Sequence, residues 1–261
     1  MKAVILCGGQ GTRIRELTDL IPKPMVDIGG KPIVWHIMNS YAQFGIKDFI
    51  LALGYKGDIL KNYFLNYQSL SNDFTVNLSN GSINVHQKNS FDLDWNVTLV
   101  DTGESAMTGS RIKQLESHIE EESFFVTYGD GLSNVDINRQ IKFHKSHNKI
   151  ATLVGVNPPS RFGELVIGED NKITKFIEKA ETSGTQGYIN GGFYIFNKEI
   201  FKYLSKKESC ILEKDPLENL VKDNQLQVYK HDGFWQCMDT YREFQILNEL
   251  AAESPWTNGY K

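Results

Sequence analysis

The chain has 261 residues and a formal net charge of −4. This length allows one α/β domain with a large core, and the slight acidity excludes the basic surfaces that bind nucleic acid or anionic lipid. The cysteines Cys7, Cys210 and Cys237 form no CxxC pair, which favours a reduced, cytoplasmic location. No apolar run is long enough to span a membrane or to act as a secretion signal. We therefore expect neither nucleic acid nor a membrane as a partner.

Short apolar runs alternate with amphipathic helical patterns along the chain, which predicts a mainly parallel α/β sheet with crossover helices. The runs expected to form strands are Ala3–Cys7, Phe49–Leu53, Val97–Val100, Phe124–Thr127 and Thr152–Val156. Helices are expected over Pro32–Phe44, after the second run with Ile59, Leu60, Tyr63 and Phe64 buried, and near Ile112–Ile119.

Two β-hairpins are expected to interrupt this alternation. Phe74–Leu78 and Ile83–His86 flank Asn80-Gly81, a pair typical of a type I′ turn. Glu164–Ile167 and Ile173–Ile177 flank a second turn. Because no polar linker divides the chain, we expect a single domain over residues 1–261.

One further helix start is predicted late in the chain. Asp215 is expected at its N-cap, Pro216 in its first turn, and Glu218 at the position that completes a capping box.

The first predicted strand leads into the glycine-rich segment Gly8-Gly9-Gln10-Gly11-Thr12-Arg13. Glycines there allow positive φ angles and let backbone N–H groups approach phosphate oxygens. The dinucleotide fingerprint fails because Ile14 stands where it needs glycine, and the P-loop fails because no Gly-Lys-Ser/Thr closes the loop. Lys23 follows, held in an extended segment by a proline on each side. Arg13 and Lys23 could together grip a triphosphate; the alternative is a tight turn with two solvated cations.

Several segments resemble those of the sugar-1-phosphate nucleotidyltransferases, most of all the bacterial glucose-1-phosphate cytidylyltransferases. They are GGQGTR, PKPM, YGDG, EK, INGG and FWQCMDT, with GGKPIVWHIM, GYKG, WNVTLVDTG and MTGSRIK similar to the cytidylyl branch. The resemblance extends from Met1 nearly to the C-terminus. It implies a Rossmann-like, mixed α/β fold flanked by helices. It also implies a nucleotide-binding part over about residues 1–130, a sugar-binding part over about 131–240, and a C-terminal helix over about 240–252.

The resemblance also implies a reaction. A cytidylyl group would pass from CTP to α-D-glucose 1-phosphate, giving CDP-glucose and pyrophosphate, with Mg²⁺ as cofactor and a homo-oligomer, a hexamer, as the assembly. The product would feed deoxysugar or surface polysaccharide synthesis. Three alternatives stay open: the same chemistry with another base or sugar, a nucleotide-sugar glycosyltransferase, and a regulatory domain. Many relatives have proline where this chain has Ala180, which leaves the choice of sugar open.

We expect Arg13, Lys23 and Asp130 to be the catalytic residues: the two cations would hold phosphates, and the resemblance gives Asp130 a metal ion. The residues that would contact the nucleotide are Leu6, Gly8, Gly9, Gln10, Gly11, Thr12, Arg13, Lys23, Ala106, Arg111 and Gly129. Arg111 has a simpler alternative, a solvated cation in the first turn of a helix.

Asp130 and Asp239 are assigned by the resemblance as Mg²⁺ ligands. Magnesium prefers hard oxygen ligands, takes few from the protein, and keeps water and phosphate oxygens for the rest. The alternatives are a surface turn for Asp130 and a helix N-cap for Asp239. Asp101 ends a strand and Asp136 opens a helix, so neither is expected at the site.

The sugar phosphate is assigned to Gly163, Glu178, Lys179 and Asn190. A carboxylate accepts from two vicinal sugar hydroxyls, and a neighbouring ammonium holds a phosphate; the alternative for Glu178 and Lys179 is a surface ion pair. Zinc is not expected at His144 and His147, because no carboxylate at metal spacing accompanies them. Trp235 is expected in the core.

Overall fold

The computed structural model describes residues 1–86, 93–157, 164–167, 172–177 and 187–257. Its central element is a seven-stranded sheet in the order β14-β10-β13-β8-β1-β4-β7. These strands are β1 (Ala3–Cys7), β4 (Asp48–Leu53), β7 (Asn96–Asp101), β8 (Ser123–Tyr128), β10 (Ala151–Val156), β13 (Ile189–Asn197) and β14 (Leu226–His231). β13 runs antiparallel to both neighbours, and the other neighbouring pairs are parallel. The predicted mixed, mainly parallel α/β sheet is confirmed.

The carboxyl ends of the central strands lie at one edge of this sheet. Leu6 of β1 pairs with Ala52 of β4 on one side and with Tyr128 of β8 on the other. Because the three strands are parallel, the segments that follow them leave the sheet at the same edge, where ligands bind in open α/β sheets. The Gly129 N–H donates to the Leu6 carbonyl at 3.1 Å, which fixes the turn after β8 beside the glycine-rich segment.

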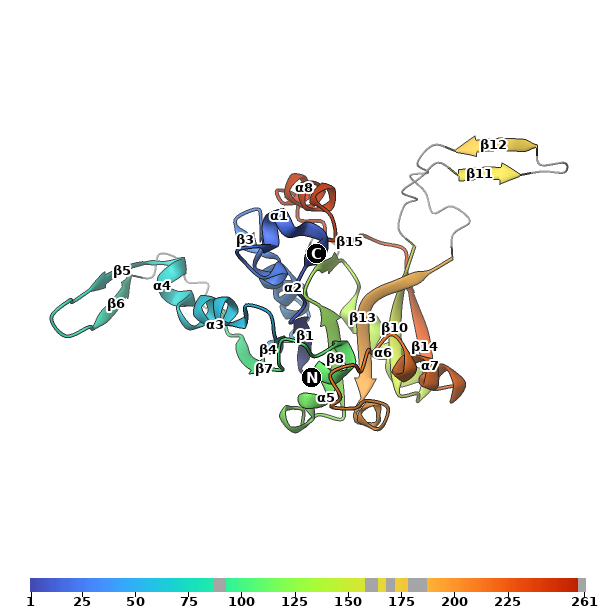
Figure 1. Cartoon of the computed structure of the whole chain (residues 1–261), viewed down its shortest axis with the longest axis horizontal. Coiled ribbons are helices and arrows are strands. Elements are labelled where there is room, and N and C mark those ends of the chain that lie inside the picture. The colour runs from blue at the N-terminus through green and yellow to red at the C-terminus, as the bar shows by residue number, and fades with distance from the viewer. Residues whose placement is uncertain (87–92, 158–163, 168–171, 178–186, 258–261) are drawn as a thin grey trace.

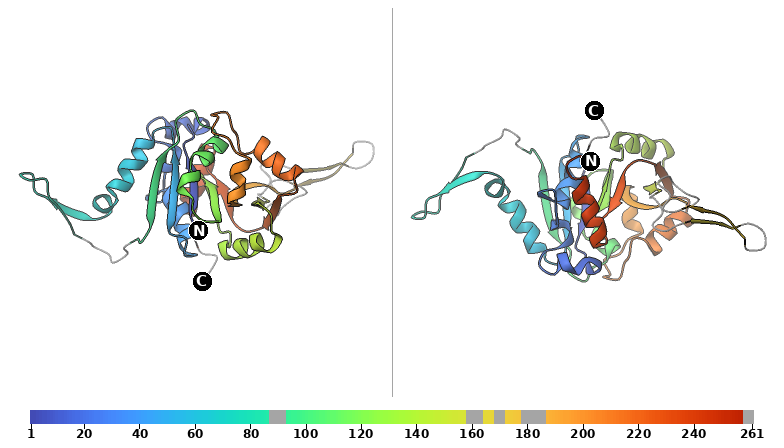
Figure 2. Two further views of the ribbon diagram at one scale, coloured as in Figure 1. Left: turned by 90° about the horizontal axis from the view of Figure 1, so that it is seen from below. Right: turned by 90° about the horizontal axis from the view of Figure 1, so that it is seen from above.

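Helices cover both faces of the sheet (Figure 2). Side chains of β1 alternate, so Ala3, Ile5 and Cys7 join one hydrophobic cluster while Val4 and Leu6 join the other. The first cluster is covered by α2 (Ile33–Ala42), α3 (Gly57–Leu65), α6 (Ile137–His147) and α8 (Tyr241–Leu250). The second is covered by α5 (Thr108–Gln114), η5 (Lys198–Lys202) and α7 (Asp215–Lys222).

Short elements connect these layers. They are η1 (Thr12–Ile14), α1 (Arg15–Thr18), η2 (Lys23–Met25), β2 (Asp27–Ile28), β3 (Lys31–Pro32), α4 (Tyr67–Ser71), η3 (Glu116–His118), β9 (Gly131–Ser133) and β15 (Trp235–Cys237). β15 pairs antiparallel with β9, with Cys237 opposite Gly131. This pairing brings the segment that precedes α8 to the end of β8.

Two hairpins project away from the sheet on opposite sides (Figure 1): β5 (Asp73–Val76) with β6 (Ile83–His86), and β11 (Glu164–Ile167) with β12 (Ile173–Ile177). The predicted strands of both hairpins are present, but the prediction of a type I′ turn at Asn80-Gly81 is wrong. That turn needs a positive φ at both central residues, and only Gly81, at +72°, has one. The Asn77 side chain instead accepts from the Ser79 N–H, and that of Asn80 from the Ser82 N–H.

Two local predictions are also wrong. α7 starts at Asp215 itself and has Lys214 at its N-cap, because the Glu218 N–H donates to the Lys214 carbonyl at 2.9 Å. In α3 only Leu60 is fully buried, whereas Ile59, Tyr63 and Phe64 are half-buried. Within the described ranges, no helix has the length and apolar character needed to cross a membrane.

Candidate active site

Two adjoining pockets lie at the carboxyl edge of the sheet. The first, which we call the glycine-loop pocket, has a volume of about 330 Å³. It is lined by Leu6, Cys7, Gly8, Gly9, Gly11, Thr12, Arg13, Lys23, Pro24, Ala106, Met107, Thr108, Arg111, Tyr128, Gly129 and Asp130. The second, the Asn190 pocket, also has a volume of about 330 Å³. Arg13, Tyr128 and Asp130 line both, so the pockets meet at these residues.

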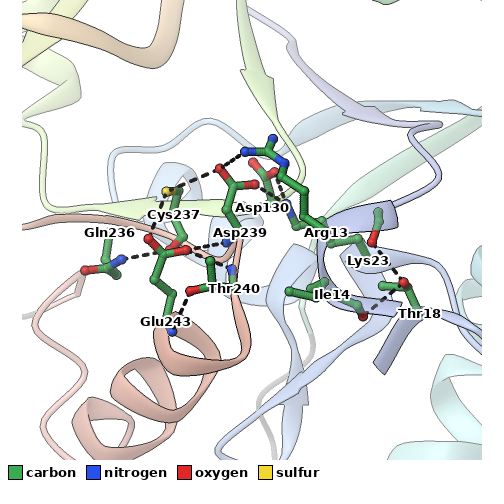
Figure 3. Close-up of polar contacts among 11 residues, drawn as sticks. Arg13, Ile14, Thr18, Lys23, Asp130, Gln236, Cys237, Asp239, Thr240 and Glu243 are labelled. Carbon is green, nitrogen blue, oxygen red and sulfur yellow. Dashed lines mark hydrogen bonds and ion pairs between the residues drawn. The ribbon is translucent and has the colours of Figure 1, made fainter. Parts of the chain in front are cut away.

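Two cations and two carboxylates form a cluster where the pockets meet (Figure 3). Lys23 Nζ donates to Asp130 Oδ2 at 2.6 Å and to Asp239 Oδ1 at 2.7 Å. Arg13 Nη1 donates to Asp239 Oδ2 at 2.8 Å. The structure therefore brings the three predicted catalytic residues together with the second predicted metal carboxylate, although they come from distant parts of the chain.

The Lys23 ammonium is held in its charged form within this cluster. Only 11% of its side chain is exposed, against 72% for Arg13. Burial lowers the pKa of Lys23, but the Asp130 and Asp239 carboxylates outweigh burial and raise the pKa above its ordinary value of 10.5. A buried positive charge therefore lines the glycine-loop pocket next to Asp130, and the exposed charge of Arg13 lies where the two pockets meet.

Asp239 owes its position to a capping box at the start of α8. The Thr240 hydroxyl accepts from the Glu243 N–H at 3.3 Å, and the Glu243 carboxylate accepts from the Thr240 N–H at 2.9 Å. Glu243 Oε2 also accepts from the Asp239 N–H at 2.7 Å. Thr240, rather than Asp239, is thus the N-cap, so the alternative of Asp239 as a helix cap is wrong. The Asp239 side chain points into the charged cluster instead.

Asp130 is positioned by the turn between β8 and β9. Gly129 is required there, because a Cβ on it would lie 2.9 Å from the Leu6 carbonyl oxygen and 3.0 Å from Pro24 Cγ. The Asp130 carbonyl accepts from the Met238 N–H at 2.9 Å. This hydrogen bond ties the backbone of the two carboxylate-bearing segments together, one residue away from Asp239.

The glycine-rich segment forms one wall of the glycine-loop pocket. Gly11 has a φ of +63°, in the left-handed region that favours glycine. All the predicted nucleotide-contacting residues of this segment line the pocket except Gln10, whose side chain is exposed. The backbone geometry is therefore that of a loop with room beside it for a phosphate-bearing ligand.

Arg111 lines the same pocket but is buried, with 4% of the residue exposed. Its guanidinium donates to the carbonyls of Leu53, Gly8, Gly103 and Glu104 and to the Thr102 hydroxyl, at 2.7 to 3.1 Å. The alternative of a solvated cation is thus wrong. Arg111 joins the loop after β1 to the ends of β4 and β7, so it shapes the pocket wall through the backbone.

Of the four predicted sugar-phosphate residues, the structure describes Asn190, which lines the Asn190 pocket. Gly163, Glu178 and Lys179 lie outside the described residues. The two aspartates that were not expected at the site have structural roles. Asp136 caps α6 by accepting from the Arg139 N–H, and Asp101 accepts from the Gly103 N–H.

Several pocket residues had no site role predicted from the sequence. Tyr128 and Glu213 are two of them and line the Asn190 pocket. Trp235, which was expected in the core, packs against the first hydrophobic cluster and also lines this pocket, where its Nε1 donates to the Gly191 carbonyl at 2.8 Å. Tyr128 is the first residue of the YGDG segment quoted for the resemblance, which was a usable signal. Glu213 had none, because its partners lie far away in sequence.

The two aspartates fit a magnesium ion. Each carboxylate accepts a hydrogen bond from the Lys23 ammonium, so the oxygens of both face a common point. Two carboxylates suffice for Mg²⁺, which completes its coordination with water and substrate phosphate oxygens. Among the residues with a described structure, no group of three or more His, Cys, Asp or Glu side chains is arranged to hold a metal ion.

Comparison with known proteins agrees with this arrangement. The nucleotidyl transferase family model matches residues 2–245. A probable glucose-1-phosphate cytidylyltransferase of Bacillus subtilis (strain 168) is 42% identical over 259 residues, covering 99% of this chain and 97% of that protein. The glucose-1-phosphate cytidylyltransferase of Salmonella typhi is 45% identical over 259 residues, covering 98% of each chain.

A solved structure agrees as well. HddC from Yersinia pseudotuberculosis, complexed with GMP-PN, has a TM-score of 0.67 and 26% sequence identity, covering 95% of this chain and 98% of that one. The chain therefore belongs to the nucleotidyl transferase family.

Proposed function

We propose that this chain transfers a cytidylyl group from CTP to α-D-glucose 1-phosphate, forming CDP-glucose and pyrophosphate. The observation that carries the proposal is the position of Lys23, a buried ammonium that lines the glycine-loop pocket and is hydrogen-bonded to Asp130, where the two pockets meet, and to Asp239 of the Asn190 pocket. The names of the Bacillus subtilis and Salmonella typhi relatives, which match over nearly the full chain, supply the base and the sugar.

In this proposal the nucleotide occupies the glycine-loop pocket. Backbone N–H groups between Gly8 and Thr12 approach the triphosphate, and Arg13 provides a planar, exposed cation for the β- and γ-phosphates. The base lies against the backbone near Ala106 on the same wall. The sugar 1-phosphate occupies the Asn190 pocket, and Gly163, Glu178 and Lys179 complete the contacts with it.

The reaction is an in-line displacement at the α-phosphorus. A phosphate oxygen of the sugar 1-phosphate forms the new P–O bond while the bond to pyrophosphate breaks. The sugar phosphate is an anion near neutral pH, so no general base has to remove a proton. The obstacle is repulsion between two polyanions, which Lys23 and Arg13 reduce by placing positive charge between the pockets.

Asp130 and Asp239 would hold the Mg²⁺ ion of this proposal. When bound, the ion would withdraw charge from the phosphate oxygens and offset their repulsion. The part of these residues is to present oxygens to one point, Asp130 from the turn after β8 and Asp239 from the start of α8. With both carboxylates engaged by the ion, Lys23 and Arg13 would be available to donate to phosphate oxygens.

A product assay tests the proposal. The protein is incubated with equal CTP, UTP, dTTP and GTP, a mixture of hexose 1-phosphates, and Mg²⁺, and the products are identified by mass spectrometry while pyrophosphate is followed by a coupled assay. We expect CDP-glucose as the main product. A different nucleotide sugar as the main product would contradict the proposed substrates. Sugar transfer without pyrophosphate release would contradict the proposed reaction.

Two further features belong to the proposal. We infer a homo-oligomer, a hexamer by resemblance, and a division into a nucleotide part over about residues 1–130 and a sugar part after it. Light scattering on the purified protein measures the first. A monomer at micromolar concentration would contradict it.

A further inference from the structure

A continuous chain of side-chain hydrogen bonds joins the walls of the two pockets. In the Asn190 pocket, Asn190 Nδ2 donates to the Tyr194 hydroxyl at 2.6 Å, and the Tyr194 and Tyr128 hydroxyls lie 3.2 Å apart. The Tyr128 hydroxyl donates to Glu213 Oε1. Glu213 Oε2 accepts from the Thr108 hydroxyl at 2.7 Å, and Thr108 lines the glycine-loop pocket.

The direction of this chain follows from counting protons. Each hydroxyl has one proton to donate. The Tyr128 proton is given to Glu213, so the contact between the two tyrosines must use the Tyr194 proton. A tyrosine hydroxyl keeps its proton over the physiological pH range, so both tyrosines are donors. Donation therefore runs from Asn190 to Glu213, and again from Thr108 to Glu213, which is the common acceptor.

The sugar-side end of the chain fixes the orientation of Asn190. Its Oδ1 accepts from the Gly192 N–H at 2.8 Å while its Nδ2 donates to Tyr194, so the amide cannot turn over. Gly192 also leaves room for the Tyr128 ring, because a Cβ at position 192 would lie 2.5 Å from that ring. Its φ of +80° favours glycine as well.

The other end of the chain fixes the start of α5. The Thr108 hydroxyl donates to Glu213 and accepts from the Leu212 N–H at 2.9 Å. α5 carries Arg111, whose guanidinium donates to the Gly8 carbonyl in the glycine-rich segment. Glu213 thus lies between the residue that faces the sugar pocket and the helix that shapes the nucleotide pocket.

We propose that Glu213 is a positioning residue for both substrates: it orients Asn190 through Tyr128 and Tyr194, and it holds the nucleotide wall through Thr108. This inference rests on the proposed function of the two pockets. Glu213 forms no bond to the reacting atoms. It acts by holding the two pocket walls that bind the substrates, with each of its carboxylate oxygens accepting one hydrogen bond. An amide offers only one acceptor oxygen, so glutamine cannot accept both bonds in this way.

The test compares Glu213→Gln, Tyr128→Phe and the double variant by steady-state kinetics with CTP, glucose 1-phosphate and Mg²⁺. Glu213→Gln is expected to raise KM for both substrates, that for glucose 1-phosphate by about tenfold, with kcat within about threefold of wild type. Tyr128→Phe is expected to raise KM for glucose 1-phosphate alone. The double variant is expected to match Glu213→Gln, because both changes cut the same chain.

Glu208→Gln is the matched control, since it removes the same charge from the same segment at an exposed side chain. Unchanged KM values in Glu213→Gln, or KM effects that multiply in the double variant, would overturn the inference. A fall in kcat together with a lower melting temperature would assign Glu213 a structural role only. The wild-type protein is assayed first, and if it forms no CDP-glucose, the proposed function is contradicted. If the wild type is active and Glu213→Gln has unchanged KM values, only the role of Glu213 is contradicted.

Discussion

At the scale of single residues, the charge on Lys23 dominates the candidate site. The ammonium is nearly buried, and two carboxylates keep it protonated. A buried charge that is satisfied from two sides holds its position, unlike the exposed Arg13 side chain. Such a preorganised donor costs little reorganisation when charge develops on a reacting phosphate.

Lys23→Ala is expected to lower kcat/KM by at least about 10²–10³, the usual cost of removing one preorganised donor of this kind. The variant should stay folded, because the Asp130 and Asp239 carboxylates it leaves behind are partly open to water. Pyrophosphate release measures activity, and Lys142→Ala, a change at an exposed lysine of α6, is the control. Turnover near the wild-type value would remove Lys23 from the catalytic residues.

Arg111 illustrates a different residue role. Arg111→Ala removes five buried hydrogen bonds, to four carbonyls and one hydroxyl, so we expect the free energy of unfolding to fall by about 2–4 kcal/mol. Urea titration measures this loss. Arg139→Ala, at a side chain 76% exposed, is expected to change stability by less than about 1 kcal/mol. Equal stability of the two variants would show that the buried hydrogen bonds contribute little.

At the scale of elements, the capping box of α8 positions the site. Glu243 is 6% exposed and accepts from the backbone N–H groups of both Asp239 and Thr240. The start of this helix therefore determines where the Asp239 carboxylate points. A helix cap and a candidate metal ligand share one backbone turn, which couples helix stability to activity.

Glu243→Ala is accordingly expected to lower the free energy of unfolding by about 1–2 kcal/mol and to lower kcat/KM as well. Glu249→Ala, at an exposed position of the same helix, should change neither. Thermal melting and the pyrophosphate assay provide the two readouts. Loss of stability with full activity would show that Asp239 keeps its direction without the capping box.

The helix starts and strands also show what sequence can predict. The bounds of β1, β11 and β12 follow from local apolar runs, so they agreed with the prediction residue for residue. The Asn80-Gly81 turn did not, because nearby asparagine side chains compete for the backbone N–H groups.

The site itself was only partly predictable. Lys23 and Asp130 lie in recognisable motifs, but the contact between Lys23 and Asp239 spans 216 positions of sequence. Glu213 and Tyr128 meet across 85 positions. Such contacts are set by strand order and by the β9–β15 pairing, which local patterns do not encode.

At the scale of the whole molecule, stability depends on histidines buried in the neutral form. His36 Nε2 lies 2.7 Å from the Ile28 carbonyl, and His36 Nδ1 accepts from Trp256 Nε1 at 3.3 Å. His144 lies between Thr152 and Asn197. Burial lowers the pKa of both histidines below the ordinary value of 6.5.

Below about pH 6.5 these histidines become protonated in the unfolded chain while they stay neutral in the folded protein. The free energy of unfolding therefore decreases as the pH is lowered. We expect a lower free energy of unfolding at pH 5.5 than at pH 7.5, by at most about 1.4 kcal/mol per pH unit for each histidine. Urea titrations at several pH values give the slope of the free energy of unfolding against pH for the wild type and for His36→Gln. A slope unchanged by the substitution would exclude His36 as a contributor.

The most direct measurement for the whole account is a crystal structure of the protein with a non-hydrolysable CTP analogue, glucose 1-phosphate and Mg²⁺. The account predicts the triphosphate against the segment from Gly8 to Arg13, the sugar beside Asn190, and Lys23 Nζ within hydrogen-bond distance of phosphate oxygens. A triphosphate bound away from the turn after β1, with Lys23 directed elsewhere, would contradict it.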